Sequence, residues 1–161
     1  MKTQKAEKVL IALDYDPTAQ KVAEAGFSLA KDMKAEVVIL HVMTDPVYYS
    51  SPGYSPIMGF TGYADGGQLQ LESIDALKTA TSQYLENVKK HLGDDTIKIM
   101  IKEGDFADSI LATAKSVHAD IIVMGSVSRK WLEKIIMGSV TEKVLQLTTV
   151  PLFIVPTKKQ D

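Results

Sequence analysis

Continuous apolar runs alternate with amphipathic stretches along the chain. The runs at residues 9–13, 37–42 and 120–124 are typical of strands buried on both faces, and the run at 151–156 predicts a last strand at an edge of the sheet. Residues 96–102 instead alternate lysine with isoleucine, which indicates a strand exposed on one face. Between the runs, apolar residues recur at helical spacing, which predicts a helix after each of the first four strands.

This alternation predicts one α/β domain over residues 1–161, built on an open five-stranded parallel sheet with helices on both faces. The half-exposed strand at 96–102 belongs near a sheet edge, which suits the strand order 3-2-1-4-5. Residues 44–70 are rich in Tyr, Gly and Pro and show no periodicity. We interpret them as an insertion within this domain.

Short-range signals predict where the helices begin and end. Asp105 and Ser139 are expected as N-caps, and Asp16 followed by Pro17 predicts the start of the first helix. Gly93 is expected as a C-cap. The helix that follows Asp105 is expected to place His118 on its inner side, together with Ile110, Leu111 and Ala114.

Composition and charge exclude several classes of function. The net charge of -2 gives no sign of binding to nucleic acid or to an anionic membrane. The absence of cysteine removes disulfides and thiolate chemistry and fits a reducing compartment. The first apolar run is too short for a signal peptide, and no run reaches the length of a membrane span. We therefore expect a cytoplasmic protein.

The histidines do not suggest a metal site. None of them shows ligand spacing with another histidine or with a carboxylate cluster. His41 lies inside a strand pattern, so we expect packing or a local hydrogen bond there.

Two Gly-Ser pairs follow the fourth strand, at Gly125 and at Gly138. In an open α/β sheet, ligands bind at the carboxyl ends of the strands where the strand order reverses, here between strands one and four. Asp14 ends the first strand and Gly125 ends the fourth, so both are expected at this crevice. Gly138 and Ser139 begin the last helix, whose free amides and dipole attract anions.

The spacing leaves two interpretations of these residues open. The Asp14 carboxylate opposite an amide-lined helix start suits the ribose and phosphate ends of a nucleotide, and the Thr141 hydroxyl adds a further hydrogen-bonding group. Equally, Gly125 need only let the chain turn, and Gly138-Ser139 need only separate two helices. Neither GxxxxGK[ST] nor GxGxxG is present, so no stronger phosphate-loop motif decides between them.

Several stretches follow the pattern of one family: VLIALD, VVILHV, EGDFADSILATA, ADIIVMGS, GSVTEKVL and VPLFIVP. Together they resemble the universal stress protein family over nearly the whole chain. Its nucleotide-binding branch carries Gly, two residues, Gly, nine residues, Gly, then Ser or Thr, and Gly125, Ser128, Gly138 and Ser139 occupy these places. The resemblance implies a Rossmann-like, adenine nucleotide alpha hydrolase-like fold.

The resemblance also implies an adenine nucleotide: ATP, or otherwise AMP, ADP or a cyclic nucleotide, with Mg²⁺ held by the phosphates. Its binding residues would be Ala12, Asp14, Val42, Met124, Gly125, Ser128, Arg129, Gly138, Ser139, Val140 and Thr141. Asp14 would bind the ribose, and the backbone of Val42 would face the adenine. Ser128 stands where the family has glycine, and its Cβ limits the backbone beside a phosphate.

By resemblance, the protein would be a stress-response regulator or sensor and not an enzyme, with at most slow ATP hydrolysis, because no general base is placed for it. The alternative is a nucleotide-free interaction module of the same family that docks protein partners. Residues 44–70 would cover a bound base or form a flap or subunit contact. A homodimer would form through the last strand, at Leu152, Phe153, Ile154 and Val155.

Overall fold

Strands and helices alternate through the computed structural model, which describes residues 7–14, 18–43, 74–126 and 138–157. The elements are β1 (Lys8–Ala12), α1 (Ala19–Met33), β2 (Glu36–Met43), α3 (Ile74–Leu92), β3 (Lys98–Glu103), α4 (Phe106–Ser116), β4 (Ile121–Gly125), α5 (Ser139–Leu147) and β5 (Leu152–Val155). The strands form one parallel sheet in the order β3-β2-β1-β4-β5, which confirms the predicted topology.

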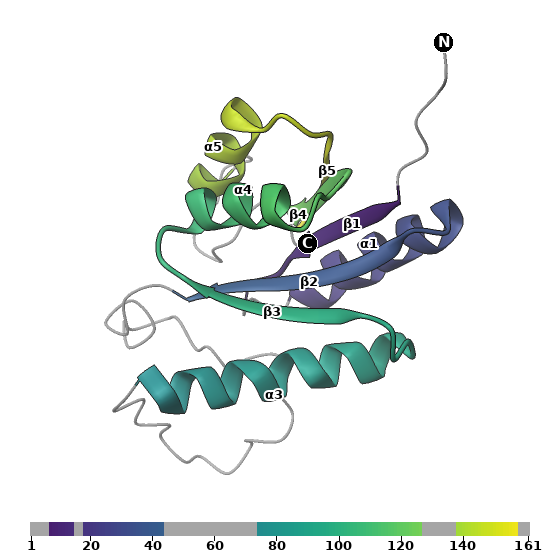
Figure 1. The fold of residues 1–161 in the computed structure, drawn as a ribbon, viewed down its shortest axis with the longest axis vertical. Coiled ribbons are helices and arrows are strands. Elements are labelled where there is room, and N and C mark those ends of the chain that lie inside the picture. Colours follow the sequence, from purple (N-terminus) through teal and green to yellow (C-terminus); the bar gives the residue numbers. More distant parts are fainter. Residues whose placement is uncertain (1–6, 15–17, 44–73, 127–137, 158–161) are drawn as a thin grey trace, which may run out of the picture.

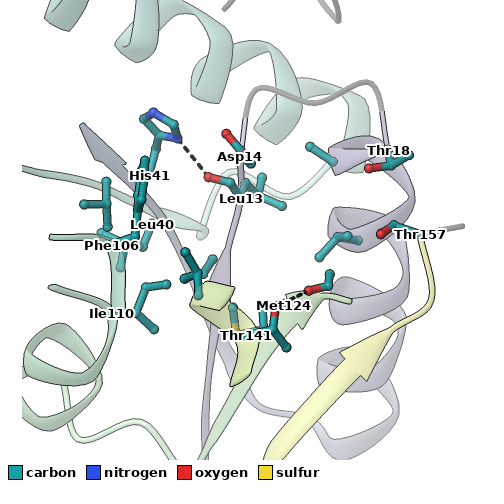
Figure 2. Close-up of a pocket in the computed structure, with 16 residues that line it drawn as sticks. Leu13, Asp14, Thr18, Leu40, His41, Phe106, Ile110, Met124, Thr141 and Thr157 are labelled. Carbon is teal, nitrogen blue, oxygen red and sulfur yellow. Dashed lines mark hydrogen bonds between the residues drawn. The ribbon is translucent and has the colours of Figure 1, made fainter. Parts of the chain in front are cut away.

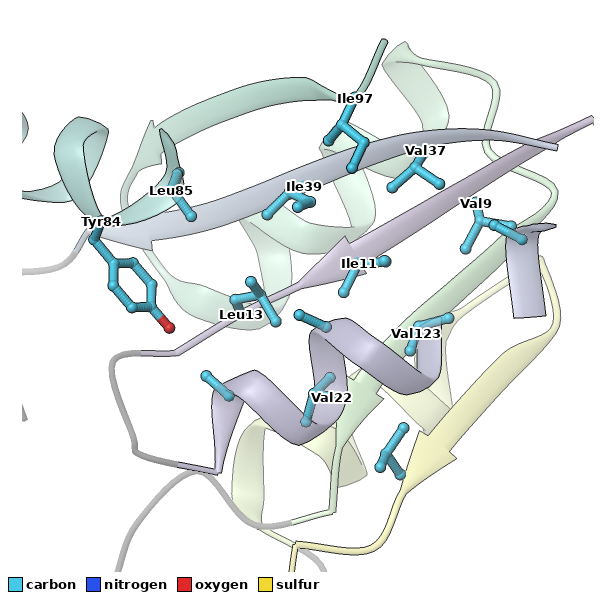
Figure 3. Packing of buried hydrophobic residues seen from close by; sticks show 14 of the residues in the cluster. Val9, Ile11, Leu13, Val22, Val37, Ile39, Tyr84, Leu85, Ile97 and Val123 are labelled. Atoms are coloured by element: carbon cyan, nitrogen blue, oxygen red, sulfur yellow. The ribbon is translucent and has the colours of Figure 1, made fainter. Parts of the chain in front are cut away.

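Helices cover both faces of this sheet, as Figure 1 shows. Alternate residues of one strand point to opposite faces, so β1 contributes to two separate cores. Val9 and Ile11 pack with α1 and α3 on one face, where Figure 3 shows Ile11 between Ile39 and Val22. Leu10 packs on the other face with residues of α4 and α5. The nearly continuous apolar sequence of β1 follows from this two-sided burial.

The two edge strands differ in how they meet solvent. β3 exposes Lys98, Lys102 and Glu103, which confirms the half-exposed strand predicted from its alternating sequence. β5 forms the opposite edge, and its Phe153 side chain is 41% exposed. Charged side chains discourage further strand pairing at an edge, whereas an apolar edge invites it.

Two of the predicted helix ends are confirmed. The Asp105 carboxylate accepts a hydrogen bond from the Asp108 amide at 3.0 Å and caps α4. Gly93 has φ +74°, and its amide bonds to the last turn of α3. The start of α1 is later than expected, with Thr18 at the N-cap position and no cap from the Thr18 side chain. The expected Asp16-Pro17 start lies outside the described residues.

The predicted N-cap at Ser139, at the start of α5, is wrong. Gly138, and not Ser139, is the N-cap, and glycine has no side chain that could cap the helix. The reason is the first intrahelical hydrogen bond, in which the Glu142 amide donates to the Gly138 carbonyl at 2.9 Å. Ser139 is therefore the first helical residue, and it lies exposed.

The expected place of His118 is also wrong, because α4 ends before it. His118 has φ +56° and is exposed. Its amide donates to the Lys115 carbonyl at 3.3 Å, while the Ala119 amide donates to the Ala114 carbonyl at 2.9 Å. This pair of bonds is the Schellman motif, which requires a left-handed residue directly after the helix.

Candidate functional site

A cavity of about 640 Å³, counting its open mouth, lies at the carboxyl ends of β1, β2 and β4. Figure 2 shows it between the sheet, α1 and the start of α5. Its apolar wall includes Leu40, Val42, Ile110, Met124 and Val140. Residues with polar side chains also line it, namely Asp14, Thr18, His41, Thr141 and Thr157. The cavity therefore occupies the crevice where the strand order reverses, as the sequence predicted.

Most of the residues expected at a nucleotide site line this cavity: Ala12, Asp14, Val42, Met124, Gly125, Val140 and Thr141. Gly138 and Ser139 are not among the lining residues, although they form the start of α5 beside it. Ser128 and Arg129 lie outside the described residues. The structure thus brings together residues from three strands and one helix that are far apart in the chain.

The start of α5 is attached to the end of β4 by two hydrogen bonds. The buried Thr141 hydroxyl donates to the Gly125 carbonyl at 2.9 Å, and the Gly138 amide donates to the Ser126 carbonyl at 2.8 Å. Among the described residues, nothing accepts from the amides of Ser139, Val140 or Thr141. These amides form the positive end of the helix dipole next to the cavity.

A side-chain contact fixes the chain after β4. The Ser126 amide donates to the Val155 carbonyl at 2.9 Å, and the Ser126 hydroxyl accepts from the Thr157 amide at 3.1 Å. A Cβ on Gly125 would lie 2.9 Å from Thr157 Cγ2 and 3.1 Å from Val22 Cγ2. Gly125 is therefore needed for close packing, which is a structural role beside any contact with a ligand. Sequence reasoning missed Thr157, because no local signal marks a residue after the last strand as part of a cavity.

The end of β1 carries Asp14 into the cavity wall. The Leu13 amide donates to the Leu40 carbonyl at 2.9 Å and continues the pairing of β1 with β2. The Leu13 carbonyl then accepts from His41 Nδ1 at 2.8 Å, and the Asp14 carbonyl accepts from the Tyr84 hydroxyl at 3.2 Å. Neither His41 nor Tyr84 was expected here as part of a site.

His41 is only 1% exposed. Burial lowers the pKa of its imidazole to about 4, and the hydrogen bond to Leu13 opposes this shift only in part. The imidazole is therefore neutral at pH 7. Because a carbonyl only accepts, Nδ1 carries the proton. The expected local hydrogen bond of this histidine is confirmed.

Asp14 supplies the only charged side chain among the described residues that line the cavity. Across the described ranges, no cluster of three or more His, Asp or Glu residues could hold a metal ion. Nor does any described helix have the length and apolarity that crossing a membrane requires. The cavity combines an apolar middle, one carboxylate and one helix N-terminus, which suits an organic ligand with both hydroxyl and anionic groups.

Comparison with known proteins identifies the family. The profile named "Universal stress protein family" matches residues 5–156. The chain belongs to the universal stress protein family. It is 30% identical to universal stress protein MJ0577 of Methanocaldococcus jannaschii over 156 residues, which cover 94% of this chain and 96% of that protein. It is 31% identical to universal stress protein YxiE of Bacillus subtilis over 151 residues, or 92% of this chain and 97% of the relative.

Solved structures share the fold of this universal stress protein. The structure of MJ0577 superimposes with a TM-score of 0.71 and 27% identity, covering 98% of this chain and 100% of the other. UspA from Lactobacillus plantarum gives 0.72 at 18% identity, covering 95% and 99%. A universal stress protein in complex with cAMP gives 0.66 at 18% identity, covering 96% and 100%. The sheet order is that of the expected adenine nucleotide alpha hydrolase-like fold.

Proposed function

We propose that this universal stress protein binds an adenine nucleotide in the cavity, with ATP as the first candidate, and acts as a stress-response regulator or sensor. One observation carries the proposal: the cavity at the reversal of strand order has the Asp14 carboxylate at the end of β1 and the α5 N-terminus at the end of β4. Ligands of such sheets bind at this place. The polarity matches a nucleotide, since a carboxylate accepts from a ribose hydroxyl and helix amides donate to phosphate.

The cavity wall suggests how the nucleotide lies. The apolar side chains of Leu40, Val42 and Ile110 suit a flat adenine ring, next to the β2 backbone at Val42. The Asp14 carboxylate then takes the ribose, and the amides of the first turn of α5 take the phosphates. Ser128 and Arg129 are proposed on the phosphate side. Mg²⁺ would arrive with the nucleotide, held mainly by phosphate oxygens.

Several adenine nucleotides share the adenosine end, so ADP, AMP and a cyclic nucleotide are included in the proposal. A structural neighbour in complex with cAMP supports this wider class, although at 18% identity it establishes only the fold. A linear triphosphate would bring most of its negative charge next to the α5 amides, whereas a cyclic monophosphate would bring little negative charge there. ATP is therefore the ligand that uses both ends of the cavity.

Thermal unfolding with and without millimolar Mg-ATP tests the proposal. A ligand at about 100 times its dissociation constant adds roughly 2.7 kcal/mol to the free energy of unfolding, which raises Tm clearly. Asp14→Asn should reduce this rise, since the amide binds a hydroxyl less strongly than a carboxylate does. Asp95→Asn, at an exposed carboxylate between α3 and β3, is the matched control and should leave it unchanged.

The absence of any Tm change with ATP, ADP, AMP and cAMP would reject nucleotide binding. The nucleotide-free interaction module would then be the better account of this family member. A Tm rise that Asp14→Asn leaves intact would reject the placement of the nucleotide in this cavity.

We propose further that the protein is not an efficient enzyme. Among the described lining residues, the groups able to move protons are the Asp14 carboxylate, which the proposal assigns to the ribose, and the neutral His41. Neither is assigned to a γ-phosphate. ATP hydrolysis should therefore run far below about 1 s⁻¹, the lower end of typical enzyme turnover. Release of labelled phosphate measures it, and turnover in the enzymatic range would contradict the assignment.

We also propose a cytoplasmic homodimer that forms along β5, at Leu152, Phe153, Ile154 and Val155. This strand is an apolar sheet edge, and exposed Phe153 marks it. Phe153→Lys should convert a dimer to a monomer in light scattering after gel filtration. Lys98→Glu, on the opposite edge strand, is the control. A monomeric wild-type protein would contradict the dimer and leave nucleotide binding unaffected.

A further inference from the structure

The backbone that carries Asp14 is held by side chains and not by the sheet. β1 ends at Ala12, and the Leu13 amide makes the last backbone bond of this segment to β2. The next two carbonyls, of Leu13 and Asp14, accept instead from His41 Nδ1 at 2.8 Å and from the Tyr84 hydroxyl at 3.2 Å. Two consecutive peptide units are thus fixed by two donors from other elements.

Both donors are buried residues. His41 belongs to β2 and is 1% exposed, and Tyr84 belongs to the long helix α3 and is 7% exposed. A buried donor that loses its partner costs free energy, so these bonds resist opening. Figure 3 shows the Tyr84 hydroxyl directed toward the end of β1 near Leu13.

The two donors approach the backbone from the side opposite the apolar cavity wall. His41 lies two residues after Ile39 in β2, so both side chains point to the same face of the sheet. Ile39 packs on the face covered by α1 and α3, and Tyr84 belongs to that same core. Leu40 and Val42 face α4 and α5, where they form the apolar wall. The carbonyls are therefore anchored on one side, while the Asp14 residue remains part of the cavity lining.

We propose that His41 and Tyr84 are positioning residues that fix the Asp14 carboxylate in place. They thereby determine how strongly the site prefers a nucleotide with both ribose hydroxyls over a deoxy analogue that lacks one of them. This inference rests on the proposed nucleotide binding and deepens it. A hydrogen bond discriminates against an analogue that lacks the hydroxyl only if its acceptor is held in place. The ligand class is therefore an adenine ribonucleotide, and the two donors act on it through the Asp14 backbone.

The experiment measures dissociation constants for ATP, 2′-deoxyATP and 3′-deoxyATP by calorimetry on the full chain. In the wild-type protein, one of the deoxy analogues should have a dissociation constant at least about tenfold higher than that of ATP. The reason is that this analogue lacks the ribose hydroxyl that donates to the charged Asp14 carboxylate. Tyr84→Phe removes only the hydroxyl and should reduce this discrimination about fivefold. His41→Leu should reduce it as well, whereas His41→Asn keeps an N–H donor and should restore it.

The discrimination ratio separates positioning from general destabilisation. Thr148→Val is the matched control, because it removes hydrogen bonds to Val150 at the end of α5 remote from Asp14. It should lower stability and leave the ratio unchanged. Asp14→Asn should reduce the ratio, and adding Tyr84→Phe to it should have little further effect, because both act on the same contact.

The outcomes distinguish this inference from the function on which it rests. Wild-type protein that binds ATP and both deoxy analogues equally would overturn the inference and leave nucleotide binding standing. Tyr84→Phe with an undiminished ratio would also overturn it. Failure to bind any adenine nucleotide would overturn both.

Discussion

Lowering the pH should destabilise the folded protein through His41. In the unfolded chain the imidazole has its ordinary pKa of 6.5, whereas burial lowers the pKa in the folded state to about 4. Between these values the unfolded state binds a proton that the folded state does not. The free energy of unfolding therefore falls as the pH drops through this window, and above about pH 7 the contribution of His41 no longer changes.

The size of the effect follows from the two pKa values. Each unit of difference corresponds to about 1.4 kcal/mol, so the separation from 6.5 to about 4 gives a loss of roughly 3 kcal/mol once the pH reaches 4. The side chain is 1% exposed, so solvent screening reduces this little. A loss of this size is a large part of the stability of an ordinary domain.

Urea unfolding of the unliganded protein, followed by circular dichroism between pH 7.5 and 4.5, measures this loss. His41→Asn removes the titrating group and keeps an N–H donor, so its curve should be flatter than that of the wild type by about 2–3 kcal/mol over this range. His118→Asn is the control, since His118 is exposed and asparagine tolerates its positive φ. Parallel losses in wild type and His41→Asn would refute the argument that His41 is buried and neutral.

Other expected outcomes concern packing and capping. Thr81→Val should raise the free energy of unfolding by about 1 kcal/mol, because the buried Thr81 hydroxyl has no hydrogen-bond partner among the described residues. Urea unfolding measures this, and an unchanged or lower midpoint would contradict it. Gly125→Ala should lower the free energy of unfolding by about 1–3 kcal/mol, because the new Cβ contacts Thr157. Adding Thr157→Ser should recover part of this loss in thermal unfolding. A Gly125→Ala variant as stable as the wild type would argue against the contact. Asp105→Ala should lower the free energy of unfolding by about 1 kcal/mol, since the Asp108 amide loses the acceptor that caps α4. Equal stability of the variant and the wild type in urea unfolding would count against that hydrogen bond.

The sheet could be predicted because its strands are marked by local sequence. A strand buried on both faces must be apolar at nearly every position, so β1, β2 and β4 appear as continuous runs. β3 shows its edge position through exposed Lys98 and Lys102. Asp105 and Gly93 mark helix ends for equally local reasons, because each satisfies backbone groups within a few residues of itself.

The rest of the site could not be predicted, because it depends on contacts between distant segments. Tyr84 carried the helical spacing of a core residue, and nothing in that spacing shows that its hydroxyl meets Asp14. Thr157 follows the last strand and lines the cavity, and its amide donates to the hydroxyl of Ser126, which is distant in the sequence. Ser139 was expected as a cap because its type favours that position, but the hydrogen bonding of the helix starts one residue earlier, at Gly138.

The position of β1 in the sheet has a consequence for how the chain is made. β1 lies between β2, which follows it closely, and β4, where Val9 pairs with Ile121 after α3, β3 and α4 have intervened. While a ribosome is still translating α4, the first strand has one neighbour and one bare side. We therefore expect the nascent chain to expose an unpaired strand edge until its fourth strand emerges, and we expect cellular yield to depend on that interval as well as on final stability.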